Sequence, residues 1–407
     1  MDIRSLELGA IDFFCCGINF MDRGKETLSK SHLKLHKIFS TDELRAVASK
    51  WDDLWLRSDV CLPRARAHLL AFWADNFVQN GEFQALMVEQ GDRLIAALPL
   101  VSQSFKGFLR TGCLATGHAV TGGEFLLDPE AGGPDVFDLL VSALARSSFF
   151  FVQFNGVPVD EARWQGFLEA FGRAGLLTDV SEEYAIGRVA IRNDWTSYEA
   201  GLSRNHRRNR RKQENMMARE GEPRLLVLTD IATSQVVQLL QRGFEVEDRS
   251  WKGREGTSVL KNPDIFDFLC QEAVQLAKLG LLELVFLEHD GKPVAFSYGW
   301  RSKGIHYTAK VGYDESYQRY GPGHQLMMLF LRHLHGLPRP QLVDFHGPIA
   351  AWTGSWATHR YPVCRVLATT NRLLSRPFFL LNYRTRPWLM ECCSHWFHRG
   401  ASNSNKS

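Results

Sequence analysis

The feature that most constrains the fold of this chain is an order of predicted elements that occurs twice. A hairpin over residues 83–100 is matched by a second over residues 282–301, and each consists of two apolar, strand-like runs around a polar turn. The segments Gly-Asp-Arg-Leu-Ile-Ala, from residue 91, and Asp-Gly-Lys-Pro-Val-Ala, from residue 290, occupy the same place in that order. Because internal repeats fix architecture before local detail does, we predict two related α/β halves.

The elements that follow each hairpin alternate between helix and strand. The first half continues with a helix, a strand and a helix, and the second with a strand, a helix and a strand, at residues 135–146, 149–154, 160–174, 304–313, 324–335 and 341–345. We expect the join near residues 178–190, where the chain becomes polar and acidic. The predicted parts are therefore residues 1–180, residues 181–370 and an amphiphilic tail, 371–407.

Composition excludes several classes of protein. The 407 residues suffice for two domains, each with its own core. With a net charge of only +3 and a pI of about 8.4, no global field favours binding to nucleic acid or membrane. The eight cysteines lack metal-ligand spacing, which predicts no metal site and reduced thiols. Since we find neither a secretion signal nor an apolar run of ~18 residues, we expect a cytoplasmic protein without a transmembrane segment.

The segment from Tyr317 to Gly323 lies between a strand-like run and a strongly apolar helix. A glycine-bracketed turn at a helix start presents unpaired backbone N–H groups and the positive end of the helix dipole to an anion. Pro322, between the two glycines, removes one of those donors. The alternative interpretation is a tight loop that caps a buried helix.

Several motifs in the second half, over roughly residues 190–350, resemble the GNAT-type acyltransferases of the CelD or BioF2-like kind, relatives of the FemAB peptidyltransferases. The motifs are Leu202-Ser203-Arg204, Arg207 to Arg211, Ser250 to Gly253, Asp290 to Ala295, Tyr317 to Gly323, and Val343 to Phe345. The resemblance implies an α/β (α+β) fold of two GNAT-like halves, each a mixed, mostly antiparallel sheet flanked by helices. It also implies an acyltransferase that uses acetyl-CoA or another acyl-CoA.

In such a fold two strands part beside the glycine-bracketed loop, and the donor lies between them. The resemblance therefore implies that backbone groups near Val311 and Gly312 hold the pantetheine arm. The pyrophosphate would contact the loop and the helix start, that is Arg319, Tyr320, Gly321, Gly323, His324 and Gln325. Glycines allow the close approach that a pyrophosphate requires, and an arginine supplies counter-charge.

Asp344 and His346 follow the next strand and are the candidates for acid/base catalysis. The alternatives are a hydrogen-bonded structural histidine and a loop-capping carboxylate. Relatives follow this strand with a glycine and a tyrosine–lysine pair, whereas this chain has Trp352-Thr353 near that point. The missing lysine favours a different acceptor or reduced activity.

Residues 204–212 contain five arginines, one lysine and one histidine within a segment, 197–219, that we predict to be one helix. We interpret Arg207, Arg208 and Arg211 as contacts for an anionic acceptor, with a solvated helix face as the alternative. A nucleic-acid site is disfavoured because aromatic stacking residues are missing from the cluster. A second helix is expected at 264–278.

The polar, glycine-rich segment 247–256 is typical of a functional loop. We interpret Trp251 as a stacking surface for a sugar or adenine and Lys252 as a phosphate contact. The alternative is a tryptophan that fills a gap between the halves. The first half lacks an equivalent of the glycine-bracketed loop, which indicates a degenerate copy.

The sequence thus predicts an acyl-CoA-dependent N-acyltransferase that acts on an amine of a small molecule or saccharide, in polysaccharide or envelope biosynthesis. One alternative is an aminoacyl-tRNA-dependent, FemAB-like peptidyltransferase. Another is a catalytically silent scaffold in exopolysaccharide assembly, with peripheral membrane contact through the tail.

Overall fold

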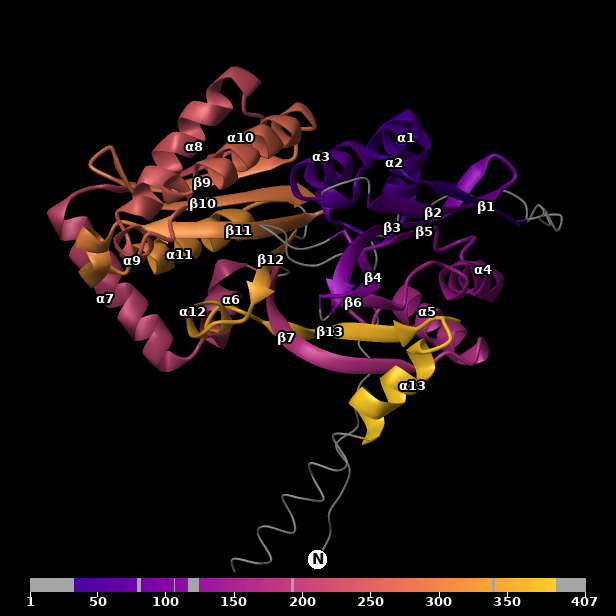
Figure 1. The fold of residues 1–407 in the computed structure, drawn as a ribbon. Coiled ribbons are helices and arrows are strands. Elements are labelled where there is room, and N and C mark those ends of the chain that lie inside the picture. Colours follow the sequence, from indigo (N-terminus) through magenta and orange to yellow (C-terminus); the bar gives the residue numbers. More distant parts are fainter. Residues whose placement is uncertain are drawn as a thin grey trace, which may run out of the picture. The chain divides into compact units, whose positions relative to one another are not determined.

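The computed structural model describes residues 33–78, 82–105, 107–115, 124–191, 194–338 and 341–385. Within these residues the strands form one mixed, mostly antiparallel sheet flanked by helices (Figure 1). The strand order is β1-β2-β3-β4-β6-β13-β7-β12-β11-β10-β9-β8, and β5 pairs with β3 outside that path. The strands are β1 (Leu33–Ile38), β2 (Phe83–Gln90), β3 (Arg93–Phe105), β4 (Leu109–Leu114), β5 (Leu126–Leu127), β6 (Phe151–Val157), β7 (Thr178–Ile191), β8 (Pro223–Leu228), β9 (Leu282–His289), β10 (Lys292–Ser302), β11 (Ile305–Tyr313), β12 (Gln341–Pro348) and β13 (His359–Thr369).

The helices lie between the strands in chain order. They are α1 (Thr41–Ala46), α2 (Ala48–Arg57), η1 (Pro63–Ala65), α3 (Ala67–Phe77), α4 (Pro134–Ala145), α5 (Ala162–Arg173), α6 (Trp195–Gly201), α7 (Arg204–Glu220), α8 (Thr233–Asp248), α9 (Trp251–Arg254), η2 (Val259–Lys261), α10 (Pro263–Lys278), η3 (Glu315–Tyr320), α11 (Pro322–His335), α12 (Ala351–Gly354), α13 (Ser375–Phe379) and the π-helical segment η4 (Leu380–Thr385).

The structure confirms the repeated order. The two predicted hairpins are β2–β3 and β9–β10, both antiparallel. Asp290 and Gly291 both have positive φ, 51° and 75°, which is the backbone of a tight type I′ hairpin turn. Each hairpin is followed by a parallel strand pair, β4–β6 in the first half and β11–β12 in the second. The halves therefore share one topology.

Two local predictions are wrong. The single helix expected at residues 197–219 is two helices, α6 and α7, because Ser203 leaves the helical path and its hydroxyl caps α7 by accepting a hydrogen bond from the His206 amide at 3.2 Å. The segment interpreted as a loop around Trp251 forms the short helix α9, which Ser250 caps through the Lys252 amide. In both places a serine side chain decides where the helix begins.

The two halves exchange a strand. β7 follows the elements of the first half but pairs with β12 of the second, and β13 follows the second half but pairs with β6 of the first. β7 and β13 pair with each other in antiparallel register, so the sheet is continuous through both halves. The predicted join at 178–190 falls inside β7, and the boundaries at 180 and 370 stay predictions.

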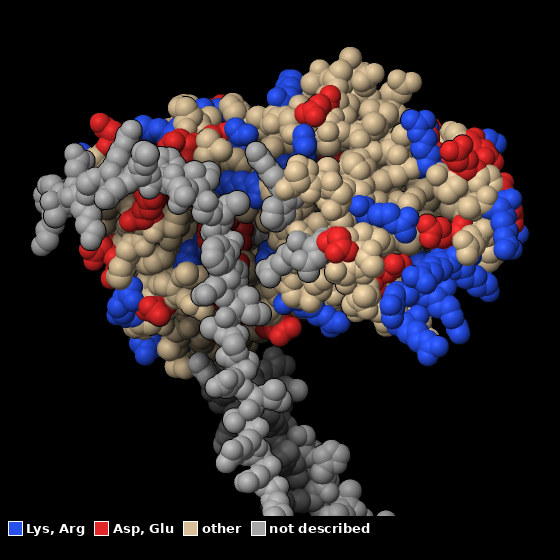
Figure 2. All heavy atoms as spheres, turned by 180° about the vertical axis from the view of Figure 1, so that it is seen from behind, with Lys and Arg blue, Asp and Glu red and all other residues tan. Residues whose placement is uncertain are grey.

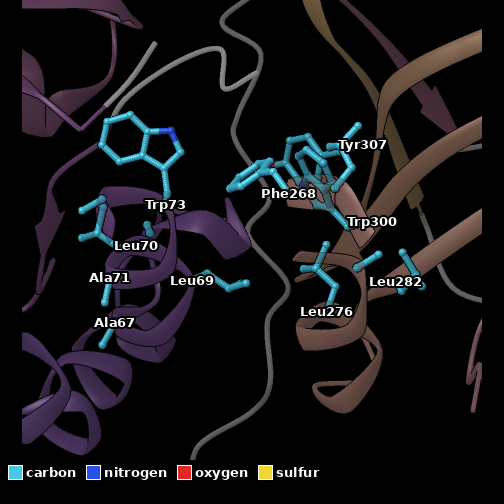
Figure 3. Close-up of a cluster of buried hydrophobic side chains, with 14 of the residues drawn as sticks. Ala67, Leu69, Leu70, Ala71, Trp73, Phe268, Leu276, Leu282, Trp300 and Tyr307 are labelled. Carbon is cyan, nitrogen blue, oxygen red and sulfur yellow. The ribbon is translucent and has the colours of Figure 1, made fainter. Parts of the chain in front are cut away.

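A shared hydrophobic cluster also joins the halves. Figure 3 shows side chains of α3, such as Leu69 and Trp73, in one cluster with Phe268 and Leu276 of α10. The rings of Phe72 and Phe268 stack with centroids 5.2 Å apart. Burial of such large apolar groups is the main source of stability here.

The predicted tail is described only to residue 385, and the remainder lies outside the described residues, as do Cys15 and Cys16. Phe379 of α13 is fully buried and packs with Phe151 and Leu367, so the start of the tail is docked on the first half. Of the helices that the structure describes, none has the length and apolar character to span a membrane.

Candidate active site

A cavity of about 640 Å³ lies in the second half, between β11, β12, α12 and the starts of α9 and α11. Its wall includes six of the residues singled out from the sequence: Trp251, Lys252, Val311, Gly321, Gly323 and His324. Residues that are up to 73 positions apart in the chain, Trp251 and His324, therefore meet at one place.

The cavity exists because β11 and β12 part. Their parallel pairing covers only Ile305–Tyr307 against Leu342–Asp344. Beyond that point β11 keeps its pairing with β10 as far as Tyr313, while β12 bends away at His346, whose φ is 48°. The register of β12 against β7 shifts over the same stretch. A bulge in β12 thus opens one edge of β11 toward the cavity.

The glycine-bracketed loop ends at the start of α11, on the cavity wall. Gly321 caps the helix in the left-handed conformation, with φ of 58°, and its carbonyl accepts the Gln325 amide at 3.0 Å. The amides of Gly323 and His324 donate to no acceptor among the described residues. A Cβ on Gly323 would meet only Tyr313 Cδ1, at 3.6 Å. The open side of this helix start therefore faces space that a ligand could fill.

Other residues of the predicted donor set lie elsewhere. Arg319 points outward and pairs with Glu220 at 2.6 Å. Tyr320 and Gln325 are buried in the surrounding core. Gly312 lies under α8, where a Cβ would come within 2.6 Å of Glu247 Cβ, so packing between strand and helix explains this glycine.

Lys252 is held against β11 rather than free in the cavity. Its Nζ donates to Glu247 Oε1 at 2.6 Å and to the carbonyl of Val311 at 3.0 Å. Glu247 is buried and also accepts the amide of Val259 at 3.0 Å. Trp251, beside it, is 42% exposed and contributes to the cavity wall.

Asp344 is a fully buried carboxylate at the point where the strands part. It accepts hydrogen bonds from Arg188 Nε at 2.7 Å, from the Tyr361 hydroxyl at 2.9 Å and from the His346 amide at 2.7 Å. Both carboxylate oxygens of Asp344 therefore accept at least one hydrogen bond. Its contact with the His346 amide holds the bulge of β12.

His346 is buried and is not one of the residues that line the cavity. Its ring contacts the rings of Trp300 and Tyr307, with centroids at 5.3 and 5.7 Å. The guanidinium of Arg64, on η1, lies 4.4 Å from the centre of the Trp300 ring. Burial, with a smaller contribution from the charge of Arg64, lowers the pKa of His346 to about 4. The imidazole is therefore neutral near physiological pH.

The basic helix α7 presents two different faces. Arg208 and Arg211 are exposed and Arg207 is half-buried, and none of the three lines the cavity. Figure 2 shows Lys and Arg side chains gathered where α7 lies. The inward face, which the sequence reasoning did not single out, carries His206, Arg210, Gln213 and Met217, at helical spacing. Of these, Gln213 lines the cavity.

Other residues of the cavity wall were not identified from the sequence. Thr308 and Tyr313 line it because they flank the point where the strands part, which no local pattern marks. Trp352 and Thr353, at the position of the missing tyrosine–lysine pair, lie on α12 and complete the wall. Among the described residues, no group of three or more His, Cys, Asp or Glu is arranged to hold a metal ion.

Comparison with known families decides the class of this region. Residues 204–352 match the family described as acetyltransferase (GNAT) domain. Over these residues the chain is similar to GNAT acetyltransferases. This matched region contains the whole wall of the cavity apart from Thr353, and the prediction of an acyltransferase is confirmed at this level.

Solved structures share the fold over most of the chain. FemX matches with a TM-score of 0.54 and 10% identity, over 85% of this chain and 99% of that one. The C-terminal domain (DUF2156) of a "Putative Lysylphosphatidylglycerol Synthetase" from Agrobacterium fabrum matches with a TM-score of 0.50 and 15% identity, over 84% and 96% of the two chains. No curated protein sequence matches this chain. The GNAT-like α/β fold is thus confirmed, and the CelD or BioF2-like kind stays a prediction.

Proposed function

We propose that this protein is an acyl-CoA-dependent N-acyltransferase that transfers an acyl group, most simply acetyl, to an amine of a small molecule or saccharide. The observation that carries the proposal is the cavity between the parted strands, which ends at the open helix start of Gly323 and His324. A thioester donor needs an extended slot for its pantetheine arm and backbone donors for its diphosphate. The GNAT domain offers both in one cavity.

The donor would lie along the free edge of β11. Backbone groups near Val311 would contact the pantetheine amides, and the amides of Gly323 and His324 would contact the diphosphate. Trp251, exposed on the wall, would stack on the adenine. In this arrangement the thioester reaches the point where β11 and β12 part.

The acceptor would enter the cavity beside Phe345 and Pro348, the wall residues on either side of His346 in the chain. The amine nitrogen forms a bond to the thioester carbon, the carbon–sulfur bond breaks, and the thiolate leaves with the electron pair. The proton lost by the nitrogen passes to the neutral imidazole of His346 and from there to the thiolate. Asp344 positions this histidine through its amide hydrogen bond at 2.7 Å, since its own oxygens are occupied by Arg188 and Tyr361.

Ligand-dependent stability tests the proposal. Acetyl-CoA at a hundredfold excess over its dissociation constant should stabilise the wild-type protein by about 2.7 kcal/mol. Gly323→Glu places a carboxylate at the proposed diphosphate position and should abolish that shift. Gly323→Ala, the matched control, adds a Cβ that meets only Tyr313 at 3.6 Å and should fold normally. A folded wild-type protein that responds to no acyl-CoA would rule the proposal out.

Aminoacyl-tRNA-dependent transfer is the second candidate. It is favoured by the exposed arginines of α7, including Arg208 and Arg211, which form a basic surface separate from the cavity. An RNA acceptor arm would lie on this surface. Binding of charged tRNA should then weaken steeply as salt rises, and exchange of both arginines for glutamine should reduce that salt dependence. Equal binding by wild type and variant would exclude the RNA-dependent reaction.

A further inference from the structure

A group of exposed leucines lies where β13 ends and α13 begins. Leu373 and Leu374, in the turn that leads into α13, have exposed fractions of 90% and 63%, and Leu381 of η4 has 62%. Single exposed apolar residues are ordinary on a protein surface, but three leucines in one short segment are a concentrated group. Phe379, in the same segment, is fully buried and packs with Phe151. The segment is therefore held on the sheet by one side chain while its leucines face outward.

Two arginines meet beside these leucines. Arg372 donates from Nη2 to the Ser148 carbonyl at 3.2 Å, and Arg110 donates from Nη1 to the Ser148 hydroxyl at 3.3 Å. Ser148 lies between α4 and β6, whereas Arg110 belongs to β4 and Arg372 follows β13. Three segments that are distant in the chain thus place two guanidinium groups at one corner of the sheet.

Arg146 and Arg376 add to this positive charge. The Asn371 amide donates to the Ala145 carbonyl at 2.9 Å, which brings Arg146 beside the start of the leucine segment. All four arginines are exposed, and none of them has a salt-bridge partner among the described residues. The sequence of residues 371–390 contains no aspartate or glutamate. The surface therefore combines apolar side chains with positive charge that no acid of the same segment balances.

A hollow of about 320 Å³ lies beside Arg146. Its wall includes the Ser142 hydroxyl group, Asn371 and Arg173, and the last of these pairs with Asp138 at 2.7 Å. Arg146 is thus the cation of this wall that is not paired with an acid in the part of the chain that the structure describes. A guanidinium with a hydroxyl and an amide nearby offers the donors that a phosphate group accepts.

We propose that the protein docks on the face of an anionic lipid bilayer through this surface, which comprises Arg110, Arg146, Arg372, Leu373, Leu374 and Leu381. A bilayer is apolar beneath its head groups and, where it contains anionic lipids, negative at its surface. The leucines would enter the interface and the arginines would contact lipid phosphates. Nucleic acid is a poorer match for the same charge, because leucine side chains offer no stacking face to a base.

The surface lies far from the cavity. Figure 1 shows α12, which completes the cavity wall, near the start of β13, and α13 at the other end of that strand. A strand of 11 residues such as β13 spans about 35 Å. Docking through the leucines and arginines would therefore leave the cavity uncovered. The inference does not depend on which donor or acceptor the cavity binds.

Vesicle binding by the full-length protein tests the inference. The protein should float with vesicles made of equal parts phosphatidylglycerol and phosphatidylcholine, but not with vesicles of phosphatidylcholine alone. Raised salt should weaken the binding, because it screens the arginines. Leu373→Ser combined with Leu374→Ser should reduce the partition coefficient by at least about tenfold, since apolar area no longer enters the interface. Arg146→Gln combined with Arg372→Gln should reduce it by about fivefold for each arginine.

Leu56→Ser is the matched control, since Leu56 of α2 is 64% exposed and lies outside this surface. It should leave vesicle binding unchanged. Wild-type protein that does not bind the mixed vesicles would overturn the inference, as would equal binding by wild type and the double leucine variant. Binding that is lost in Arg208→Gln with Arg211→Gln, but kept in the double leucine variant, would assign the contact to α7 instead.

Other occupants of the surface would give different results. If residues 386–407 cover the leucines, wild-type protein should bind no vesicles and the double leucine variant should lower the unfolding temperature. If a second copy of the chain covers them, gel filtration should show a dimer that the same variant converts to a monomer. Either result would overturn the membrane assignment, whereas a variant that folds as stably as wild type and no longer binds vesicles would support it.

Discussion

Arg64, from the first half, donates through Nε and Nη2 to the two carboxylate oxygens of Glu272, from the second, at 2.6 and 2.8 Å. Both side chains are buried, with exposed fractions of 9% and 3%. The Tyr298 hydroxyl donates to the same carboxylate at 2.8 Å. This bidentate ion pair holds η1 against α10. The Arg64 guanidinium also lies over the Trp300 ring, which in turn contacts the His346 ring.

We expect that removal of one partner of this pair destabilises the protein strongly. Arg64→Met leaves the Glu272 carboxylate buried without its cation and should lower the free energy of unfolding by about 3–5 kcal/mol. The double variant Arg64→Met with Glu272→Leu should recover much of that loss, because neither charge remains. Urea unfolding of the three proteins measures the difference. Equal losses in the single and double variants would mean that shape, rather than charge pairing, holds this contact.

The two glycines of the loop should differ in their tolerance of alanine. Gly321 has φ of 58° and its Cβ would press on Gln213, so Gly321→Ala should cost about 1–2 kcal/mol. Gly323 lies in regular helix with space around it, and Gly323→Ala should leave stability unchanged or raise it slightly. Denaturant midpoints of the two variants check this order. The reverse order would contradict the assignment of Gly321 as the helix cap.

Lys252 and Glu247 offer a third test. Lys252→Met leaves the Glu247 carboxylate, 3% exposed, without its ion-pair partner and should destabilise the protein by about 3 kcal/mol. The added change Glu247→Gln should restore most of that stability, since a neutral amide tolerates burial better than a carboxylate. Thermal unfolding compares the single and double variants. A single variant as stable as wild type would show that solvent screens this pair.

The sequence predicted the parts of the fold that local pattern determines. The hairpin turn at Asp290-Gly291 and the helix after Gly321 depend on residues that are neighbours in the chain, and both are present as expected. The pairing of β7 with β13 depends on residues far apart in the chain, and no local pattern encodes it. The tandem arrangement was therefore predictable, whereas the strand exchange was not.

The cavity wall was predicted in part for the same reason. The loop from Gly321 to His324 was identified because the residues that suggest an anion site there are neighbours in the chain. On α7, charge alone drew attention to Arg207, Arg208 and Arg211, whereas the residue of this helix that lines the cavity is Gln213, on the inward face. Which face of a basic helix packs inward depends on the partner helix, here α11, and that partner is more than 100 residues away.

The last prediction concerns pH and His346. Its pKa is about 4 in the folded protein against an ordinary 6.5, so the unfolded chain binds a proton that the folded protein does not. The contribution of the neutral, buried ring to the free energy of unfolding is therefore complete above pH 6.5. It is lost as the pH falls from 6.5 to about 4. The full effect is of order 3 kcal/mol, since one pKa unit corresponds to about 1.4 kcal/mol.

His346→Asn tolerates the positive φ and does not titrate in this range, so its unfolding free energy should fall less between pH 7 and pH 4.5 than that of wild type. Urea unfolding at several pH values measures the two slopes, and parallel slopes would show that His346 is protonated in the folded protein. Under the proposed mechanism the same variant should also lose about 10²–10⁴-fold in acyl transfer, the range of general acid–base catalysis, while it still binds acetyl-CoA.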